Sequence, residues 1–189
     1  GNIAMPKEGI PSFQSTINIA NLVQEACTAV ACAAPDCHKD EIAHLMEHVL
    51  PRIELEDFAD TPVNARGYRR KVLYAHPSGF FSVLQLEWQP GAETPVHGHN
   101  AWGCVGVISG EIGCETYDRC NASEGGVRSN GKIMAGAGAV ATVNPNPEGI
   151  HRLFNPTDKV ATTLHIYGMD LSANPCAINV PYGSSAHRN

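Results

Sequence analysis

The most informative stretch of this sequence lies between two glycines, Gly91 and Gly110, and reads GAETPVHGHNAWGCVGVISG. Its centre holds His97 and His99, which are separated by one residue. Side chains two residues apart on a β-strand point to the same face of a sheet, so we expect both imidazoles to point toward one centre. Two histidines alone are a weak signal, because polar strand faces carry histidines by chance. The residues on either side make this interpretation stronger.

The spacing of glycines and histidines here resembles the first sequence signature of the cupin barrel. The first glycine is followed by five residues and the His-x-His pair, then by three residues before Gly103 and six before the last glycine. The segment PEGIH at residues 147–151, followed by Asn155, is similar to the second signature, with one residue fewer between glycine and histidine. The resemblance implies that His151 is a third metal ligand, contributed by a neighbouring strand.

The predicted donor set departs from the common cupin pattern, in which a metal-binding Glu stands four residues after the second histidine. This sequence has Gly103 at that position. The site then consists of three neutral imidazoles without a carboxylate, which suits iron, zinc, copper or nickel rather than magnesium or calcium. Such a centre leaves a divalent ion its full charge and several open positions. It favours an anionic thiolate ligand, because coordination lowers the pKa of a thiol.

The whole chain, residues 1–189, is predicted to form one mainly β cupin domain, a jelly-roll barrel with N-terminal helices packed outside it. Apolar residues recur at helical spacing between about residues 15 and 50, where prolines separate and stop two amphipathic helices. From about residue 66 to residue 183, short runs rich in Val, Ile, Leu and Tyr alternate with Gly, Pro and Asn, which is typical of strands and turns. The glycine-rich segment 121–137 is expected to be a loop. The predicted strands are Tyr68–Tyr74, Phe80–Trp88, Gly103–Ile108, Glu111–Tyr117, Ala139–Val143 and Val160–Tyr167.

The composition disfavours several classes of partner and location. The 189 residues carry a net charge of −6, and the 13 lysines and arginines form no extended basic cluster. We therefore expect neither nucleic acid nor an anionic membrane surface as a partner. No apolar stretch approaches the ~20 residues that a membrane helix requires. Seven cysteines, an odd number, together with the lack of a signal-peptide pattern, predict reduced thiols and a cytoplasmic location.

Near its C-terminal end the chain reads Thr163-Leu164-His165-Ile166-Tyr167. On a strand, Thr163, His165 and Tyr167 share one face, where a hydroxyl, an imidazole and a phenol can form a hydrogen-bonded relay. From spacing alone, a polar strand face with one buried tyrosine is the simpler explanation. The string resembles the Ser-x-His-x-Tyr string of the thiol dioxygenases, the cupin family that includes cysteine dioxygenase, with Thr in place of Ser. The resemblance implies a catalytic role for all three residues.

The segment Tyr68-Arg69-Arg70 resembles the Tyr-x-Arg string with which cysteine dioxygenases hold the substrate carboxylate. Tyr68 and Arg70 are expected to share one face of a strand, and Arg69 to point away from it. The planar guanidinium of arginine suits this task because it meets a carboxylate with two parallel hydrogen bonds. Relatives that act on 3-mercaptopropionate tend to have Gln at the position of Arg70, which favours the cysteine branch. The alternative interpretation of Arg70 is an ordinary surface arginine.

The animal enzymes of this family crosslink a cysteine to the relay tyrosine. The equivalent position here is Gly103, and strand alternation sends the next side chain, Cys104, to the other face. We therefore expect no crosslink to Tyr167. Trp102 and Cys176 are weaker candidates for residues that line the substrate pocket.

The resemblance to thiol dioxygenases implies an enzyme that binds one Fe(II) per chain on His97, His99 and His151. It would convert a small carboxylated thiol to its sulfinic acid with O2, and L-cysteine is the first expectation for that thiol. The thiol itself supplies the electrons, so no external reductant is required.

Alternatives remain open at this point. The thiol can instead be 3-mercaptopropionate or mercaptosuccinate, and a second carboxylate would require a second cation from Arg66, Arg69 or Arg152. A zinc or nickel cupin with non-oxidative chemistry, or a cupin that only binds a small ligand, would explain the histidines but not the Thr-His-Tyr string. The sequence does not indicate an oligomeric state.

Overall fold

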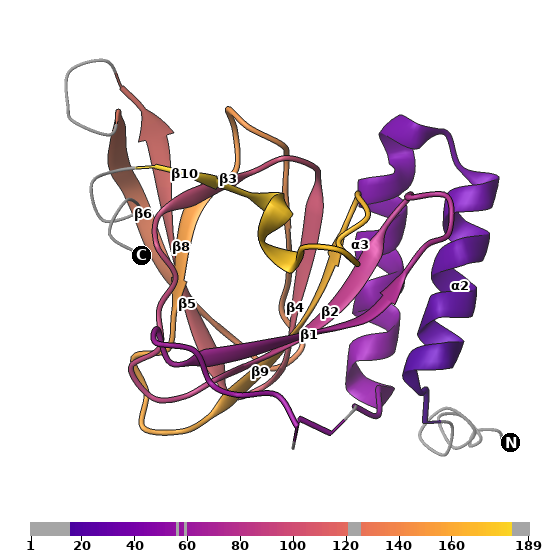
Figure 1. The fold of residues 1–189 in the computed structure, drawn as a ribbon, viewed down its shortest axis with the longest axis horizontal. Coiled ribbons are helices and arrows are strands. Elements are labelled where there is room, and N and C mark those ends of the chain that lie inside the picture. Colours follow the sequence, from indigo (N-terminus) through magenta and orange to yellow (C-terminus); the bar gives the residue numbers. More distant parts are fainter. Residues whose placement is uncertain (1–15, 56, 59, 121–125, 183–189) are drawn as a thin grey trace, which may run out of the picture.

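The computed structural model describes residues 16–55, 57–58, 60–120 and 126–182. Figure 1 shows two β-sheets that face each other as a barrel, with two helices packed against the outside of one sheet. The C-terminal part of the described chain passes across the barrel and pairs with the second sheet.

The helices are α2 (Ile19–Cys32) and α3 (His38–Val49). Each is followed by a short 3-10 turn that contains a proline, η2 (Pro35–Cys37) after α2 and η3 (Leu50–Arg52) after α3. Both helices and both proline-containing boundaries agree with the sequence prediction, because proline lacks the N–H that a continuing helix needs.

The apolar faces of the two helices pack against the outer face of the first sheet. Met46 of α3 is fully buried, and a side chain at Gly106 would lie 2.8 Å from Leu50, so the sheet and the helical segment approach closely there. This packing explains the 3.6-residue apolar period of both helices. The buried cluster comprises Ile19, Leu22, Ala26, Val30, Ile42, Met46, Val49, Leu50, Phe81, Val83, Cys104, Leu164 and Ile166.

The first sheet has the strand order β1-β2-β9-β4-β7, and every neighbouring pair in it is antiparallel. Side chains of β2 and β9 alternate between the helices outside and the barrel interior, so both faces of the central strands are buried. The strands are β1 (Tyr68–Ala75), β2 (Ser82–Trp88), β9 (Ala161–Tyr167), β4 (Gly103–Ser109) and β7 (Val140–Val143).

The second sheet has the strand order β10-β3-β8-β5-β6 and is also antiparallel throughout. Its inner face completes the barrel interior. The last 3-10 turn, η4 (Pro175–Ile178), leads into its edge strand. The strands are β10 (Asn179–Pro181), β3 (His97–His99), β8 (Ile150–Phe154), β5 (Glu111–Arg119) and β6 (Val127–Gly136).

The prediction of a loop over residues 121–137 is wrong for most of that segment. Residues 127–136 form strand β6, which pairs with β5 from Glu111↔Gly136 to Arg119↔Val127. Residues 121–125 lie outside the described residues. β6 is an edge strand, and most of its residues are exposed. Because few of its side chains face the core, the strand tolerates a polar sequence that contains glycine.

The predicted fold class, a mainly β barrel of two antiparallel sheets with helices outside, is confirmed. The register of the strands places the candidate residues: His97 lies opposite His151 between β3 and β8, and Gly103 lies opposite Tyr167 between β4 and β9. Within the described part of the chain, no helix combines the length and apolar character needed to cross a membrane.

Candidate metal centre and adjoining pocket

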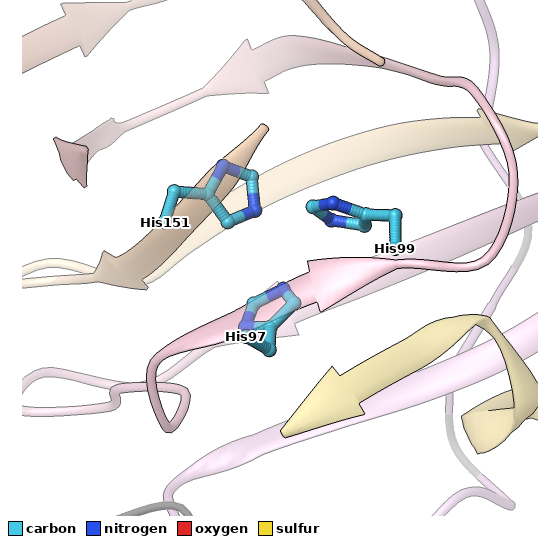
Figure 2. Close-up of side chains that lie close together, drawn as sticks. All are labelled: His97, His99 and His151. Atoms are coloured by element: carbon cyan, nitrogen blue, oxygen red, sulfur yellow. The ribbon is translucent and has the colours of Figure 1, made fainter. Parts of the chain in front are cut away.

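The three predicted ligand histidines come together inside the barrel. His97 and His99 project from β3 and His151 from β8, and Figure 2 shows their rings pointing toward one another. One ring nitrogen from each residue lies within 4.8 Å of the other two. All three side chains are buried, with His99 fully enclosed. Among the described histidine, cysteine and acidic residues, these three histidines have side chains close enough together to hold a metal ion.

The contacts of the Nδ1 atoms of His97 and His151 leave Nε2 of each ring to face the centre. Nδ1 of His97 donates to the carbonyl of Pro95 at 2.9 Å, and Nδ1 of His151 lies 3.9 Å from the thiol of Cys114. Both ring nitrogens of His99 and Nε2 of His151 are buried and have no hydrogen-bond partner among the described residues. A buried, unpaired nitrogen is costly, and a metal ion at the centre would satisfy these atoms. The residues therefore fit a metal ion.

Burial also holds these imidazoles in the form that binds metal. Desolvation lowers the pKa of His97 to about 4, and desolvation together with the neighbouring His97 lowers the pKa of His99 to about 3. The pKa of His151 is also lowered well below its usual value, first by burial and then by His97 and His99. All three rings are therefore neutral near pH 7, with free lone pairs for coordination.

A pocket of about 80 Å³ adjoins the metal centre on the side of His97. Tyr68 and Arg70 enter it from β1, and His165 and Tyr167 enter it from β9. The structure thus brings the predicted substrate-binding pair and two members of the predicted relay to one cavity beside a ligand histidine. The remaining lining is mostly apolar and includes Leu84, Leu86, Trp88, Val96, Leu153, Pro175, Ile178 and Pro181.

The relay residues form a continuous chain of hydrogen bonds. The hydroxyl of Thr163 lies 2.7 Å from Nε2 of His165, and Nδ1 of His165 lies 2.9 Å from the hydroxyl of Tyr167. The sequence analysis missed a fourth member, Trp88 on β2, whose indole N–H donates to the hydroxyl of Thr163 at 2.9 Å. Only the pairing of β2 with β9 brings this indole to the relay, so no local sequence signal identifies it.

The donor at one end favours one arrangement of protons along the relay. Indole nitrogen can only donate, so Thr163 accepts from Trp88 and its own hydroxyl proton is free to point at Nε2 of His165. In that arrangement His165 carries its proton on Nδ1 and donates to the oxygen of Tyr167, which leaves the phenolic proton available to the pocket. Burial lowers the pKa of His165 to about 3 and raises the pKa of Tyr167, so both groups are neutral.

Arg70 contacts one residue of the pocket wall, Tyr68, and one residue outside it, Cys176. Its guanidinium donates to Sγ of Cys176 at 2.9 Å, and its carbon Cζ lies 5.9 Å from the centre of the Tyr68 ring. Cys176 thus touches Arg70 without being among the residues that line the pocket. Trp102 packs elsewhere: its indole lies against Gly168, where a side chain would come within 2.2 Å of it.

The other arginines considered for a second carboxylate are not part of this pocket. Arg69 points to the outer face, where it pairs with Glu87 at 2.6 Å, as alternation along β1 predicts. Arg152 pairs with Glu93 at 2.9 Å and with Glu115 at 3.0 Å. Arg66 is also absent from the pocket lining.

The register at β4 agrees with the expected positions of Gly103 and Cys104. Gly103 faces Tyr167, and a side chain there would come within 2.7 Å of the phenol ring. Cys104 points to the opposite face, where it is fully buried in the cluster beneath the helices, and burial raises its pKa to about 12.

No protein-family model matches this chain. Solved structures similar to it include a cupin 2 conserved barrel domain protein from Salinispora arenicola, with 20% identity, a TM-score of 0.46, and coverage of 61% of this chain and 86% of that one. A cupin superfamily protein from Desulfitobacterium hafniense has 14% identity and a TM-score of 0.43, over 65% of this chain and 88% of that one. Oxalate decarboxylase from Bacillus subtilis has 23% identity and a TM-score of 0.44, over 58% of this chain and 27% of its own.

At these identities the likeness concerns the barrel and not its chemistry. With two facing antiparallel sheets and the three histidines between them, the chain has the cupin barrel fold that its glycine and histidine spacing predicts.

Proposed function

We propose that this protein is an Fe(II)-dependent thiol dioxygenase that converts a small carboxylated thiol to its sulfinic acid. One observation carries the proposal: a single pocket beside His97 contains both a guanidinium, from Arg70, and the end of a hydrogen-bonded relay, at Tyr167. A metal centre that only stabilised the fold, or a site for an uncharged ligand, would need neither group. The ligands proposed for iron are His97, His99 and His151.

In this proposal Arg70 binds the carboxylate of the substrate with two parallel hydrogen bonds. The Cys176 thiol that it now contacts is a weak acceptor, so a carboxylate competes with it readily. Tyr68 shares the pocket with Arg70 and supports its orientation by the contact of its ring with the guanidinium. The carboxylate thereby fixes the direction in which the thiol enters toward His97.

A bound ferrous ion would supply the position at which thiolate sulfur and dioxygen meet. Overall, RS⁻ and O2 give RSO2⁻, so two S–O bonds form, the O–O bond breaks, and sulfur provides all the electrons. Tyr167 directs its free phenolic proton into the pocket and donates a hydrogen bond to the reacting oxygen or sulfur atoms. Thr163 and His165 hold it in that orientation. The apolar lining excludes water and strengthens these interactions.

The lining of the pocket supports a thiol with one carboxylate. Among the described residues that line it, Arg70 is the only lysine or arginine, and none is Asp or Glu. A second carboxylate, as in mercaptosuccinate, would lack a cation, which disfavours that substrate.

The same lining supports a second candidate substrate. None of the described residues that line the pocket offers a carboxylate for the amine of cysteine, so 3-mercaptopropionate, which lacks the amine, suits the pocket as well as L-cysteine does. By resemblance to the cysteine dioxygenases, Arg70 favours cysteine as the substrate. The lack of an acidic partner for the amine in the pocket lining favours 3-mercaptopropionate.

Metal analysis combined with a thiol panel tests the proposed function. The protein reconstituted with Fe(II) is expected to consume one O2 per sulfinate formed with L-cysteine or 3-mercaptopropionate, and to turn over mercaptosuccinate far more slowly. The zinc-loaded protein is the control and should consume none. Failure of the iron form to take up oxygen with every thiol would eliminate the proposal.

Replacement of Arg70 tests its role as the anchor. Arg70→Ala is expected to lower kcat/KM for the carboxylated thiol by about 2–4 kcal/mol, or roughly 30- to 1,000-fold, because a desolvated charge-assisted bond is lost. Lys71→Ala is the matched control, since Lys71 is the next cation on β1 and donates to the backbone of Asp57 outside the pocket. Unchanged kinetics in Arg70→Ala would show that the carboxylate binds elsewhere.

A further inference from the structure

A second cavity, of about 260 Å³, lies at the opposite end of the barrel interior from the Arg70 pocket. The Arg70 pocket is lined by β1, β2, β9 and β10 and by the segments that lead into β3 and β10, whereas this cavity is lined by β4, β5, β6, β7 and β8. β6 and β7 are the edge strands of their sheets at that end, as β1 and β10 are at the other. The cavity opens toward solvent near Ile133, whose side chain is 64% exposed.

The walls of this cavity are almost entirely aliphatic. The inward-facing positions of β4 and β5 contribute Val105, Val107 and Ile112, and β6 contributes Ile133 and Ala135. None of the described residues that line it is Asp, Glu, Lys or Arg. A carboxylate or ammonium group would find no counter-charge here, and its burial would be costly. The cavity is therefore unsuited to the charged thiol that the Arg70 pocket is proposed to bind.

Among the described residues, the walls contain four polar side chains, those of Cys114, Thr116, Thr142 and His151, and two hydrogen-bonded contacts engage three of them. The hydroxyl of Thr116 is hydrogen-bonded to Asn130, and the thiol of Cys114 contacts Nδ1 of His151. Apolar cavities with few free polar groups hold water poorly and accept small apolar guests such as xenon. The guest that fits these walls is a small uncharged molecule that needs no hydrogen-bond partner.

The inner end of the cavity lies against His151, one of the three ligand histidines. His151 lines the cavity, whereas His97 lines the Arg70 pocket, so the two spaces approach the three histidines from different sides. Leu153 is shared by both linings and stands between them. A molecule in this cavity would reach His151 without passing through the Arg70 pocket.

We propose that this apolar cavity is the binding and delivery site for dioxygen. The inference rests on the proposed function, which requires one anionic and one apolar reactant at the same centre. The charged thiol enters through the pocket that contains Arg70, and O2 enters between β6 and β7. With separate routes, O2 can still arrive after the bound thiol has blocked the Arg70 pocket.

Xenon provides a direct probe, because it is apolar and can be located in crystals under pressure. Xenon is expected between Val107, Ala135 and His151, with no atom in the Arg70 pocket. An empty cavity, or xenon only beside Arg70, would overturn the inference whether or not the protein oxidises thiols.

Kinetics with a filled cavity provide the second test. Ala135→Phe on β6 is expected to raise KM for O2 by about fivefold or more while KM for the thiol and the iron content stay unchanged. Met134→Phe is the matched control, because Met134 is the next residue on β6, is 46% exposed, and does not line the cavity. Ala139→Leu, at another position in the wall, serves the same purpose if Ala135→Phe does not fold.

The outcomes separate this inference from the proposed function. If the wild-type protein oxidises thiols but KM for O2 is unaffected by both filling variants, the delivery site is wrong and the dioxygenase proposal stands. If the wild-type protein consumes no O2 with any thiol, the assignment of dioxygen fails together with the proposed function, even where xenon binds.

Discussion

Thr163 joins Trp88 to His165 in the relay, and its side chain is fully buried between them. Thr163→Val keeps the shape of the side chain but removes the hydroxyl, so nothing fixes the proton of His165 on the nitrogen that faces Tyr167. We expect kcat to fall about tenfold or more with KM for the thiol nearly unchanged, since the carboxylate anchor is untouched.

Thr163→Ser restores the hydroxyl and is expected to recover most of that loss. Steady-state oxygen uptake across a range of thiol concentrations separates kcat from KM. Equal activity of the Val and Ser variants would show that Thr163 only fills space.

Gly103 is required by the ring of Tyr167, because a Cβ at this position would lie 2.7 Å from it. Gly103→Ala should displace the phenol from its bond with His165, which lowers kcat, while the three ligand histidines still hold iron. Iron content and oxygen uptake measured on the same sample check this expectation. Full activity in Gly103→Ala would indicate that the orientation of Tyr167 does not matter.

At the scale of elements, the helices stabilise the barrel from outside and do not touch the site. Met46 of α3 is fully buried beneath the sheet, so Met46→Ala removes apolar contacts and leaves a cavity. We expect the free energy of unfolding to fall by about 2–4 kcal/mol, with iron bound per folded molecule unchanged. Glu47→Ala, at the next and exposed position, should change it by no more than about 0.5 kcal/mol.

Urea titration followed by circular dichroism measures both variants of α3. A loss of iron at full folding in Met46→Ala would contradict the view that the helices act only through the stability of the sheet.

Individual elements differ in how well the sequence predicted them. The helices are marked by a 3.6-residue apolar period and by prolines at their ends, so α2 and α3 agree with expectation. Strand β6 has little apolar content, because it lies at an edge and most of its residues face solvent. Its position in the sheet is set by backbone pairing with β5, and this pairing cannot be predicted from a pattern of apolar side chains.

At the scale of the whole molecule, the buried imidazoles make stability depend on pH. The pKa of His97 is lowered from 6.5 to about 4, and those of His99 and His165 from 6.5 to about 3. Above pH 6.5 these groups are neutral in both the folded and the unfolded chain. As the pH falls below 6.5, the unfolded chain binds protons that the folded chain excludes, so stability is lost progressively down to about pH 3.

The apoprotein is therefore expected to lose about 1 kcal/mol of unfolding free energy per pH unit for each such imidazole below pH 6. Iron affinity should fall over the same range, because protons compete for the ligand nitrogens. Urea titrations and iron binding from pH 7.5 to 5 measure both quantities. Constant stability across that interval would mean that the rings are solvated rather than enclosed.

The sequence by itself determined the local features of this protein. The period of a strand predicted that His97 and His99 share a face, and the resemblance to the cupin signatures implied the barrel and the third ligand, His151; the structure brings the three together. Alternation along single strands also predicted which of Arg69 and Arg70 faces inward. The relation of His97 to His99, and of Arg69 to Arg70, involves neighbours one or two residues apart, and the period of a strand is enough to predict it.

Only the tertiary structure determined what meets across strands. The indole of Trp88 at the end of the relay depends on the register of β2 with β9, and the apolar cavity beside His151 depends on which strands enclose it. The contact of Cys176 with Arg70 joins residues 106 positions apart. Such contacts come from the packing of two sheets into one barrel, which no periodicity within a single strand encodes.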